Sequence, residues 1–143
     1  MAEAFEAVKN NVRPEPNMIT SDSAQVKHEL HAHLRRRIAE SADQMAIGKH
    51  PDGASWGANW RALRSAGIAA PLGNATDIHE IPGMTQMPRD SKLRPGDVVI
   101  TGATETQPFG NSFIVSEDMK AASNGFHKIP DLTKYKDVRI FRA

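Results

Sequence analysis

The stretch that decides the fold is SWGANWRALRSAG, residues 55–67. Its apolar side chains Trp56, Trp60 and Leu63 recur at helical spacing and share one face, so we expect a helix here. Gly67 is its expected end, because glycine readily takes the left-handed conformation that closes a helix. A helix with one apolar face needs a surface to cover, and the rest of the chain has to supply that surface.

The chain beyond this helix changes from helical to extended patterning. Two apolar runs rich in β-branched residues follow, LRPGDVVI at 93–100 and FGNSFIV at 109–115. We expect a short capped helix at 74–80, a long loop at 81–96, and strands at 97–101, 112–116, 120–123 and 137–142. Helices followed by an antiparallel meander define an α+β fold.

A longer helix is expected ahead of these elements, over residues 22–47. Asp22 or Ser23 caps it, and Met45 extends its apolar side. Its other apolar residues recur every four positions, at Val26, Leu30, Leu34 and Ile38. Residues 13–17 contain two prolines, which do not continue a helix. The expected organisation is a flexible arm over 1–20 and a single domain over 21–143.

Composition narrows the class of protein. The 143 residues are 39% hydrophobic and 24% charged, as in ordinary globular domains, and the net charge is +1. A charge so close to zero gives no reason to expect nucleic acid, and no apolar run approaches the roughly 18 residues of a membrane span. The N-terminus has no basic region followed by an apolar one, so we expect a cytoplasmic protein, or one exported without a cleaved signal peptide.

The order of motifs over residues 52–142 resembles the papain-like hydrolases of bacterial peptidoglycan, the CHAP-type amidases and NlpC-like peptidases. The matching segments are RALRSAG at 61–67, RPGDVVI at 94–100, GNSFIV at 110–115, Ser123-Asn124, and VRIFR at 138–142. The resemblance implies a papain-like fold, with helices packed on an antiparallel sheet and an extra N-terminal helix. It also implies a catalytic triad formed at three positions of this chain.

Those three positions carry the wrong residues for catalysis. The resemblance places a nucleophilic cysteine at 55, a histidine at 111 and an orienting residue at 124, whereas this chain has Ser55, Asn111 and Asn124 and no cysteine at all. A serine hydroxyl stays protonated without a nearby base, and an asparagine amide does not titrate in the useful range. His79 and His127 are the two histidines that a relocated base would use.

The resulting expectation is a pseudoenzyme, a degenerate amidase-like domain that binds a peptide, a peptidoglycan fragment or a protein partner without cleaving it. Trp56, Asn111 and Ser123 are the expected ligand-binding residues, and no cofactor is expected. One alternative is an active cell-wall amidase or peptidase, a secreted effector or lysin, with a relocated base. Another is a protein-interaction or regulatory protein that docks a partner through helix 22–47.

Three further motifs have plainer explanations. His28 and His31 share a helix face, but the spacing is not His-Glu-x-x-His and no third ligand follows, so no metal site is expected. The basic run 35–37 is expected to be a solvated face. Residues 102–107 form a polar loop that would border the cleft of a papain-like fold.

Overall fold

The computed structural model describes residues 16–48, 55–123 and 125–143, with side chains for 24–47, 56–123 and 125–143. The elements are α1 (Pro16–Gly48), α2 (Ser55–Ser65), the 3-10 helix η1 (Ala75–Asp77), β2 (Thr85–Met87), β3 (Val98–Thr101), β4 (Asn111–Val115), β5 (Ala121–Ser123), β6 (Gly125–His127), the 3-10 helix η2 (Leu132–Lys134) and β7 (Val138–Arg142). The expected α+β class is confirmed. The chain divides into two compact units, 1–31 and 32–143, and the core and the cleft described below belong to the second.

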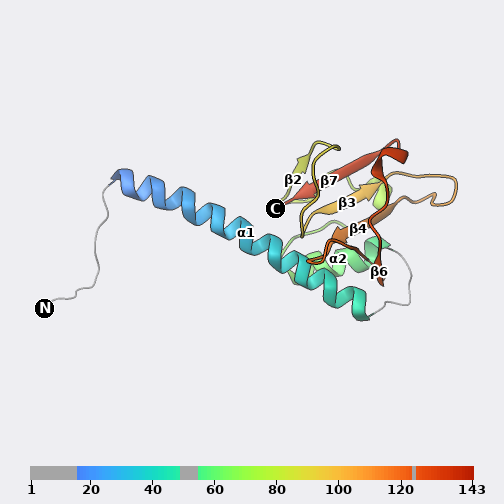
Figure 1. The fold of residues 1–143 in the computed structure, drawn as a ribbon, viewed down its shortest axis with the longest axis horizontal. Helices are drawn as coiled ribbons and strands as arrows, with labels where there is room; N and C mark the ends of the chain where they lie inside the picture. Colours follow the sequence, from blue (N-terminus) through green and yellow to red (C-terminus); the bar gives the residue numbers. More distant parts are fainter. Residues whose placement is uncertain (1–15, 49–54, 124) are drawn as a thin grey trace, which may run out of the picture. The chain divides into compact units, whose positions relative to one another are not determined.

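The strands form one six-stranded antiparallel sheet in the order β2-β7-β3-β4-β5-β6. The last strand along the chain, β7, lies between β2 and β3 (Figure 1). The apolar runs that the sequence singles out form β3 and β4, which pair with each other near the middle of the sheet. Their position explains why every residue of β3 is buried.

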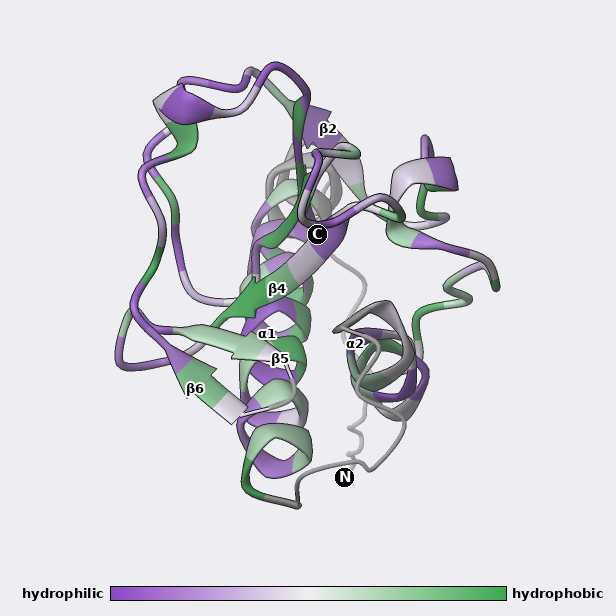
Figure 2. Ribbon diagram, turned by 90° about the vertical axis from the view of Figure 1, so that its right-hand side faces the viewer, coloured by the Kyte–Doolittle hydropathy of each residue, from purple (hydrophilic) through white to green (hydrophobic). Residues whose placement is uncertain are grey.

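Side chains alternate between two apolar clusters, one on each face of the sheet. Val98, Ile100 and Ile114 belong to the cluster that also contains residues of α2 and of the second half of α1. Val99 and Phe113 belong to the opposite cluster, which the 129–135 segment covers. Figure 2 shows β4 as mostly hydrophobic and α1 as a mixture of hydrophobic and hydrophilic residues.

Helix α1 is longer than expected and begins at Pro16, not at residue 22. Proline suits the first turn of a helix, because the backbone N–H that it lacks has no partner there. Residues 16–20, expected in the arm, are therefore helical, and the remainder of the expected arm lies outside the described residues.

The apolar side of α1 is covered only in its second half. Ile38 is fully buried and Leu34 packs against the core, whereas Val26 and Leu30 are 51% and 61% exposed. The apolar face of α1 that was predicted to dock a partner is thus buried in the core of the second unit at Ile38 and exposed to solvent at Val26 and Leu30.

The Pro-Gly-Asp turn before β3 has a structural explanation. Gly96 has φ +90°, and an added Cβ would collide with the backbone carbonyl of Arg35 in α1. Asp97 is fully buried and holds Arg142 at the end of β7 through two hydrogen bonds of 2.8 Å. The turn therefore fixes α1 and β7 to the same point of the sheet.

The four expected strands are found within one residue of their predicted limits as β3, β4, β5 and β7. The expected short helix at 74–80 is reduced to η1. Two strands were not predicted: β2 lies in the expected loop 81–96, and β6 lies in the expected connection 124–136. Each has three residues and forms an edge of the sheet, so neither shows an alternating apolar pattern.

Candidate functional site

An open cleft of about 510 Å³ lies at the first two turns of α2. Residues of three segments border it: 56–61 in α2, the loop 72–75, and the segment 107–111 that leads into β4. The cleft thus lies between the beginning of α2 and the beginning of β4.

Two tryptophans of α2 form apolar walls of this cleft. Trp56 is 4% exposed and its Nε1–H donates to the carbonyl of Pro71 at 2.9 Å. Trp60 donates to the carbonyl of Ala70 at 2.9 Å, and the Arg64 guanidinium lies 5.3 Å from its ring centroid. Both indole N–H groups bond within the protein, and of the two rings only that of Trp60 is partly exposed.

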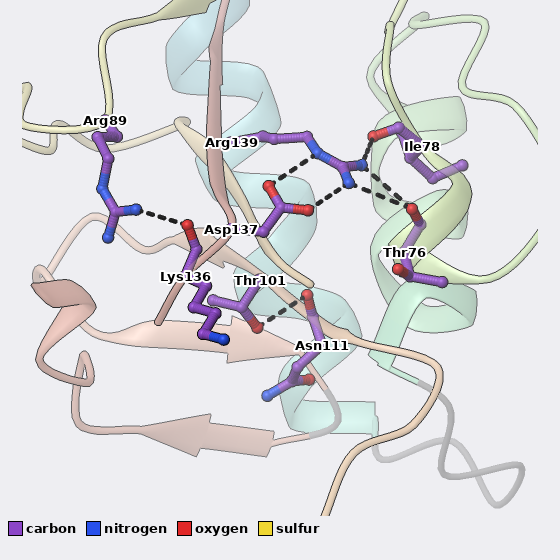
Figure 3. A network of polar contacts seen from close by, with 8 residues as sticks. All are labelled: Thr76, Ile78, Arg89, Thr101, Asn111, Lys136, Asp137 and Arg139. Carbon is purple, nitrogen blue, oxygen red and sulfur yellow. Dashed lines mark hydrogen bonds and ion pairs between the residues drawn. The ribbon is translucent and has the colours of Figure 1, made fainter. Parts of the chain in front are cut away.

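Asn111 is the first residue of β4, half-buried and on the cleft. Its Oδ1 accepts a hydrogen bond from the backbone N–H of Ser112 at 2.9 Å, and its carbonyl accepts one from the Thr101 hydroxyl at 3.5 Å (Figure 3). Its Nδ2 makes no hydrogen bond to any residue that the structure describes. The side chain is a neutral amide with donors remaining for a ligand.

A buried pair that sequence reasoning missed connects α2 to β4. The Nδ2 of Asn59 donates to Ser112 Oγ at 2.8 Å, and both residues are 1% exposed. Strand alternation places Ser112 with Ile114 on the face that α2 covers, and Asn111 alternates with them. A signal was present, because Asn59 lies four residues after Ser55 on the same side of the helix.

Arg139 of β7 supports the segments that border the cleft (Figure 3). It is 8% exposed, its Nη2 pairs with Asp137 Oδ2 at 2.6 Å, and its guanidinium donates to the carbonyls of Thr76 and Ile78. The Thr76 N–H in turn donates to the carbonyl of Phe109 at 3.1 Å. These bonds link β7, η1 and the 107–111 segment into one frame.

Gly110 is required where these segments meet. Its φ is +76°, and an added Cβ would lie 2.6 Å from the Thr101 carbonyl oxygen and 3.0 Å from the Thr76 nitrogen. No other residue fits without displacing backbone, which accounts for the glycine directly before Asn111.

The remaining triad positions are only partly described. Ser55 is the first residue of α2, as predicted for the nucleophile position, but its side chain lies outside the described part of the chain. Asn124 also lies outside it. Ser123 ends β5, is half-buried, and does not border the cleft. Of the three expected ligand-binding residues, Trp56 and Asn111 are therefore brought together and Ser123 is not.

The two histidines proposed as relocated bases lie elsewhere on the surface. His79 is exposed in the loop after η1 and does not border the cleft. His127 stands opposite Ala121, which pairs with Val115, four residues from Asn111 along β4. Four residues of strand span about 13 Å. Ala121 belongs to the cluster on the face away from α2, so His127 lies toward the other end of β4 and on the face that α2 does not cover.

The other motifs fall into place separately. Among the described residues, no group of three or more His, Asp and Glu side chains could hold a metal ion.

In the basic run 35–37, only Arg36 and Arg37 are exposed, while Arg35 donates to the carbonyl of Ala143 at 2.9 Å. Gln107, from the polar loop 102–107, does border the cleft. None of the helices in the described part combines the length and the hydropathy needed to cross a bilayer.

Comparison with known proteins gives one informative likeness. No protein-family profile and no curated protein sequence matches the chain. A chain of the crystal structure of the type VI native effector–immunity complex Tae3–Tai3 from Ralstonia pickettii is similar in fold, with a TM-score of 0.56 and 20% sequence identity. The likeness covers 75% of this chain and 98% of that chain. At this identity it establishes a shared fold.

Proposed function

We propose that this chain is a degenerate papain-like domain of the CHAP/NlpC kind, which binds a peptide-bearing ligand in its cleft and does not cleave it. The observation that carries the proposal is Asn111. Asn111, whose side chain is a neutral amide, borders the cleft at the start of β4, at the position where the resemblance expects a histidine.

Amide chemistry suits binding and not hydrolysis. Papain-type cleavage needs a nucleophile that a neighbouring base deprotonates, at a helix N-terminus that stabilises the negative charge. An asparagine accepts no proton at neutral pH, so the hydroxyl of a serine at position 55 has no activating partner from position 111. By analogy with triad knockouts, the loss of the base alone costs about ten-thousandfold or more in rate.

The ligand class follows from the groups on the cleft. Asn74, Gln107 and Asn111 carry amides that both donate and accept hydrogen bonds, which match the N–H and C=O groups of a peptide. A peptidoglycan stem peptide and a protein segment both offer such groups. The chain that is similar in fold comes from an effector–immunity complex. This likeness supports a protein as a second candidate ligand, as an alternative to a cell-wall peptide.

Turnover of purified peptidoglycan tests the absence of cleavage. We expect no release of fragments by the native chain, and release by the Ser55→Cys/Asn111→His double variant, in which nucleophile and base are restored. Cleavage by the native chain that Ser55→Ala abolishes would disprove the proposal and make His79 the first base to replace.

Titration of soluble muropeptides tests binding. We expect Asn111→Ala to weaken binding about tenfold, the effect of removing one to two hydrogen bonds at a partly buried site, without lowering the thermal midpoint. Gln86→Ala is the matched control, because Gln86 is an exposed amide on the edge strand β2, outside the cleft. Equal affinities of the native and Asn111→Ala chains would exclude Asn111 from the binding site.

A further inference from the structure

We infer that a second cavity, bordered by α1 and the turn before β3, binds the phosphate group of a ligand. This site is separate from the cleft, and the inference does not rest on the proposed function. The cavity has a volume of about 350 Å³, and we call it the arginine pocket. Its lining consists of Ala32, Arg35, Arg36, Ala39, Arg94, Pro95 and Glu117, all of which belong to the second unit.

The α1 wall of the arginine pocket is one side of the helix. Positions 32, 35, 36 and 39 recur at helical spacing, so their side chains are neighbours on the helix surface. Alanines at the two outer positions are short and leave room beside the two arginines. The basic run 35–37 is thereby divided, because Arg35 and Arg36 border the pocket and Arg37 does not.

The wall opposite α1 is fixed before any ligand binds. Gly96 packs directly on the backbone carbonyl of Arg35 and donates its N–H to the carbonyl of Val115 at 2.9 Å. The backbone N–H of Arg94 donates to the buried carboxylate of Asp97 at 2.9 Å. A site whose backbone is already ordered costs less conformational entropy when a ligand binds.

Two of the three arginines have guanidinium groups that are available to a ligand. Arg36 and Arg94 are exposed, and neither side chain forms a hydrogen bond or an ion pair with a residue that the structure describes. Arg35 is partly buried, and its Nη1 donates to the carbonyl of Ala143 at 2.9 Å. Arg35 therefore forms part of the wall, and Arg36 and Arg94 are the groups that reach a ligand.

The charge and the geometry of these groups favour phosphate. Arg36 and Arg94 outnumber Glu117, the one acidic residue of the described lining, even before Arg35 is counted. A phosphate monoester carries about −1.5 to −2 charges at neutral pH, and its three terminal oxygens are strong acceptors. Because the two guanidinium groups come from different elements, a tetrahedral group can accept from both, whereas a planar carboxylate best matches a single guanidinium.

Glu117 predicts a second effect, opposite in sign. Its exposed carboxylate borders the arginine pocket and repels a bound phosphate. Removal of this charge should therefore strengthen phosphate binding, whereas removal of either exposed arginine should weaken it. Surface charge without a defined site would not make these effects depend on the position of the substitution.

Titration of the full chain with sodium phosphate at constant ionic strength tests the inference. Backbone amide shifts of residues 35, 36, 94 and 117 are followed by NMR. The variants are Arg36→Gln, Arg94→Gln and Glu117→Gln. Arg37→Gln is the matched control, because Arg37 is an exposed arginine of the same run and lies outside the pocket.

We expect saturable shifts in the native chain and an affinity about tenfold weaker in Arg36→Gln and in Arg94→Gln, since each loses charge-assisted hydrogen bonds. Glu117→Gln should bind about two- to fivefold more tightly, and Arg37→Gln should stay within about twofold of the native chain. Thermal melts of all four variants should match the native melt, because these side chains are exposed.

Three results would overturn the inference. The first is the absence of saturable shifts around the pocket, and the second is an equal loss of affinity in Arg37→Gln and Arg36→Gln. The third is equally tight binding of sodium succinate, a dicarboxylate. Glycerol 3-phosphate and vesicles containing phosphatidic acid then separate two sources of the group: binding of both assigns a lipid headgroup, and binding of glycerol 3-phosphate alone assigns a soluble ester.

Discussion

Asp97 is a single residue whose contacts reach across the sheet. It is fully buried, accepts both hydrogen bonds from Arg142, and accepts a third from the backbone N–H of Arg94 at 2.9 Å. The side-chain hydrogen bonding to Asp97 and the charge of that carboxylate raise the pKa of Arg142, against the effect of its partial burial. The aspartate in a motif that resembles an enzyme family therefore has a purely structural use here.

Replacing Asp97 with alanine leaves the Arg142 guanidinium, whose side chain is 14% exposed, without its counter-charge. We expect the free energy of unfolding, measured by urea denaturation, to fall by about 3–5 kcal/mol. Asp90→Ala, at an exposed turn, is the control and should stay within about 0.5 kcal/mol of the native value. A loss of less than about 1 kcal/mol for Asp97→Ala would show that water replaces the carboxylate.

Asp43 of α1 has the opposite effect on stability. Its Oδ1 is buried without a hydrogen-bond partner among the described residues. Burial raises the pKa of its carboxyl, and the charges of Glu117, Asp118 and Glu40 raise it further, against a backbone hydrogen bond from Glu117. A carboxyl whose pKa is higher in the folded state destabilises the fold when ionised.

We therefore expect Asp43→Asn to raise the thermal midpoint at neutral pH. As the pH falls through the raised folded pKa of Asp43, the thermal midpoint of the native chain should rise relative to that of the variant. This relative rise should be complete below the ordinary aspartate pKa of 3.8. Thermal melts across that range measure it. Parallel pH curves for the two proteins would show that Asp43 titrates normally.

At the scale of elements, two arginines each hold a 3-10 helix and its surroundings by donating to backbone carbonyls. Arg139 holds η1 through the carbonyls of Thr76 and Ile78, next to the cleft. Arg89 donates to the carbonyls of Leu132, Tyr135 and Lys136 around η2 (Figure 3 shows the last of these). Arg89 is exposed and Arg139 is buried, so the pair offers a matched comparison.

We expect Arg139→Gln to cost about 2–3 kcal/mol of stability and to speed hydrogen exchange of the Thr76 amide, because the Ile78 carbonyl it leaves is buried and the Thr76 carbonyl is partly buried. Arg89→Gln should cost about 1 kcal/mol and leave that amide unchanged, because water replaces the guanidinium. Native-state hydrogen exchange by NMR distinguishes them. If hydrogen exchange of the Thr76 amide were equally faster in both variants, Arg139 would not be the residue that specifically holds the segments around the cleft.

Sequence reasoning predicted the elements that carry a strong apolar period and missed those that do not. β3 and β4 were found because their residues are buried on both faces, and α2 because Trp56, Trp60 and Leu63 share a side. The edge strands β2 and β6 depend on hydrogen bonds to distant strands, which leave no local pattern.

The candidate site was predicted to the same degree and for the same reason. Trp56 and Asn111 belong to motifs with fixed spacing, and the fold brings them to one cleft. The Asn59–Ser112 bond and the exposure of Leu72 and Phe109 beside the cleft result from how α2, β4 and two loops meet. Neither the burial of a polar residue nor the exposure of an apolar one can be read from a single sequence.

At the scale of the whole molecule, α1 belongs to two units at once. Up to residue 31 every described side chain of this helix is exposed, whereas in its second half Ile38, Ala42 and Ala46 belong to the core and Leu34 and Met45 pack against it. The expectation that α1 docks a partner therefore concerns Val26 and Leu30, while Ile38 serves the fold.

Substitutions along this one helix should separate the two uses. We expect Ile38→Ala to cost about 2–5 kcal/mol of stability, as for a fully buried aliphatic residue. Val26→Ser/Leu30→Ser should leave the thermal midpoint unchanged. If sedimentation shows that the double variant loses an assembly that the native chain forms, the exposed half is an interface; a large fall in its midpoint would instead mean that Val26 and Leu30 are covered.

The strand order β2-β7-β3 has a consequence for synthesis on the ribosome. β2 and β3 are made before β7, but they do not pair with each other; the place between them is taken by β7, the last strand along the chain. At about 5–20 residues per second, nascent chains wait on the order of seconds with that place empty and two strand edges unpaired. Sequence changes near residues 138–142 should therefore act first on yield in cells, through aggregation or chaperone dependence, before any defect is seen in the purified protein.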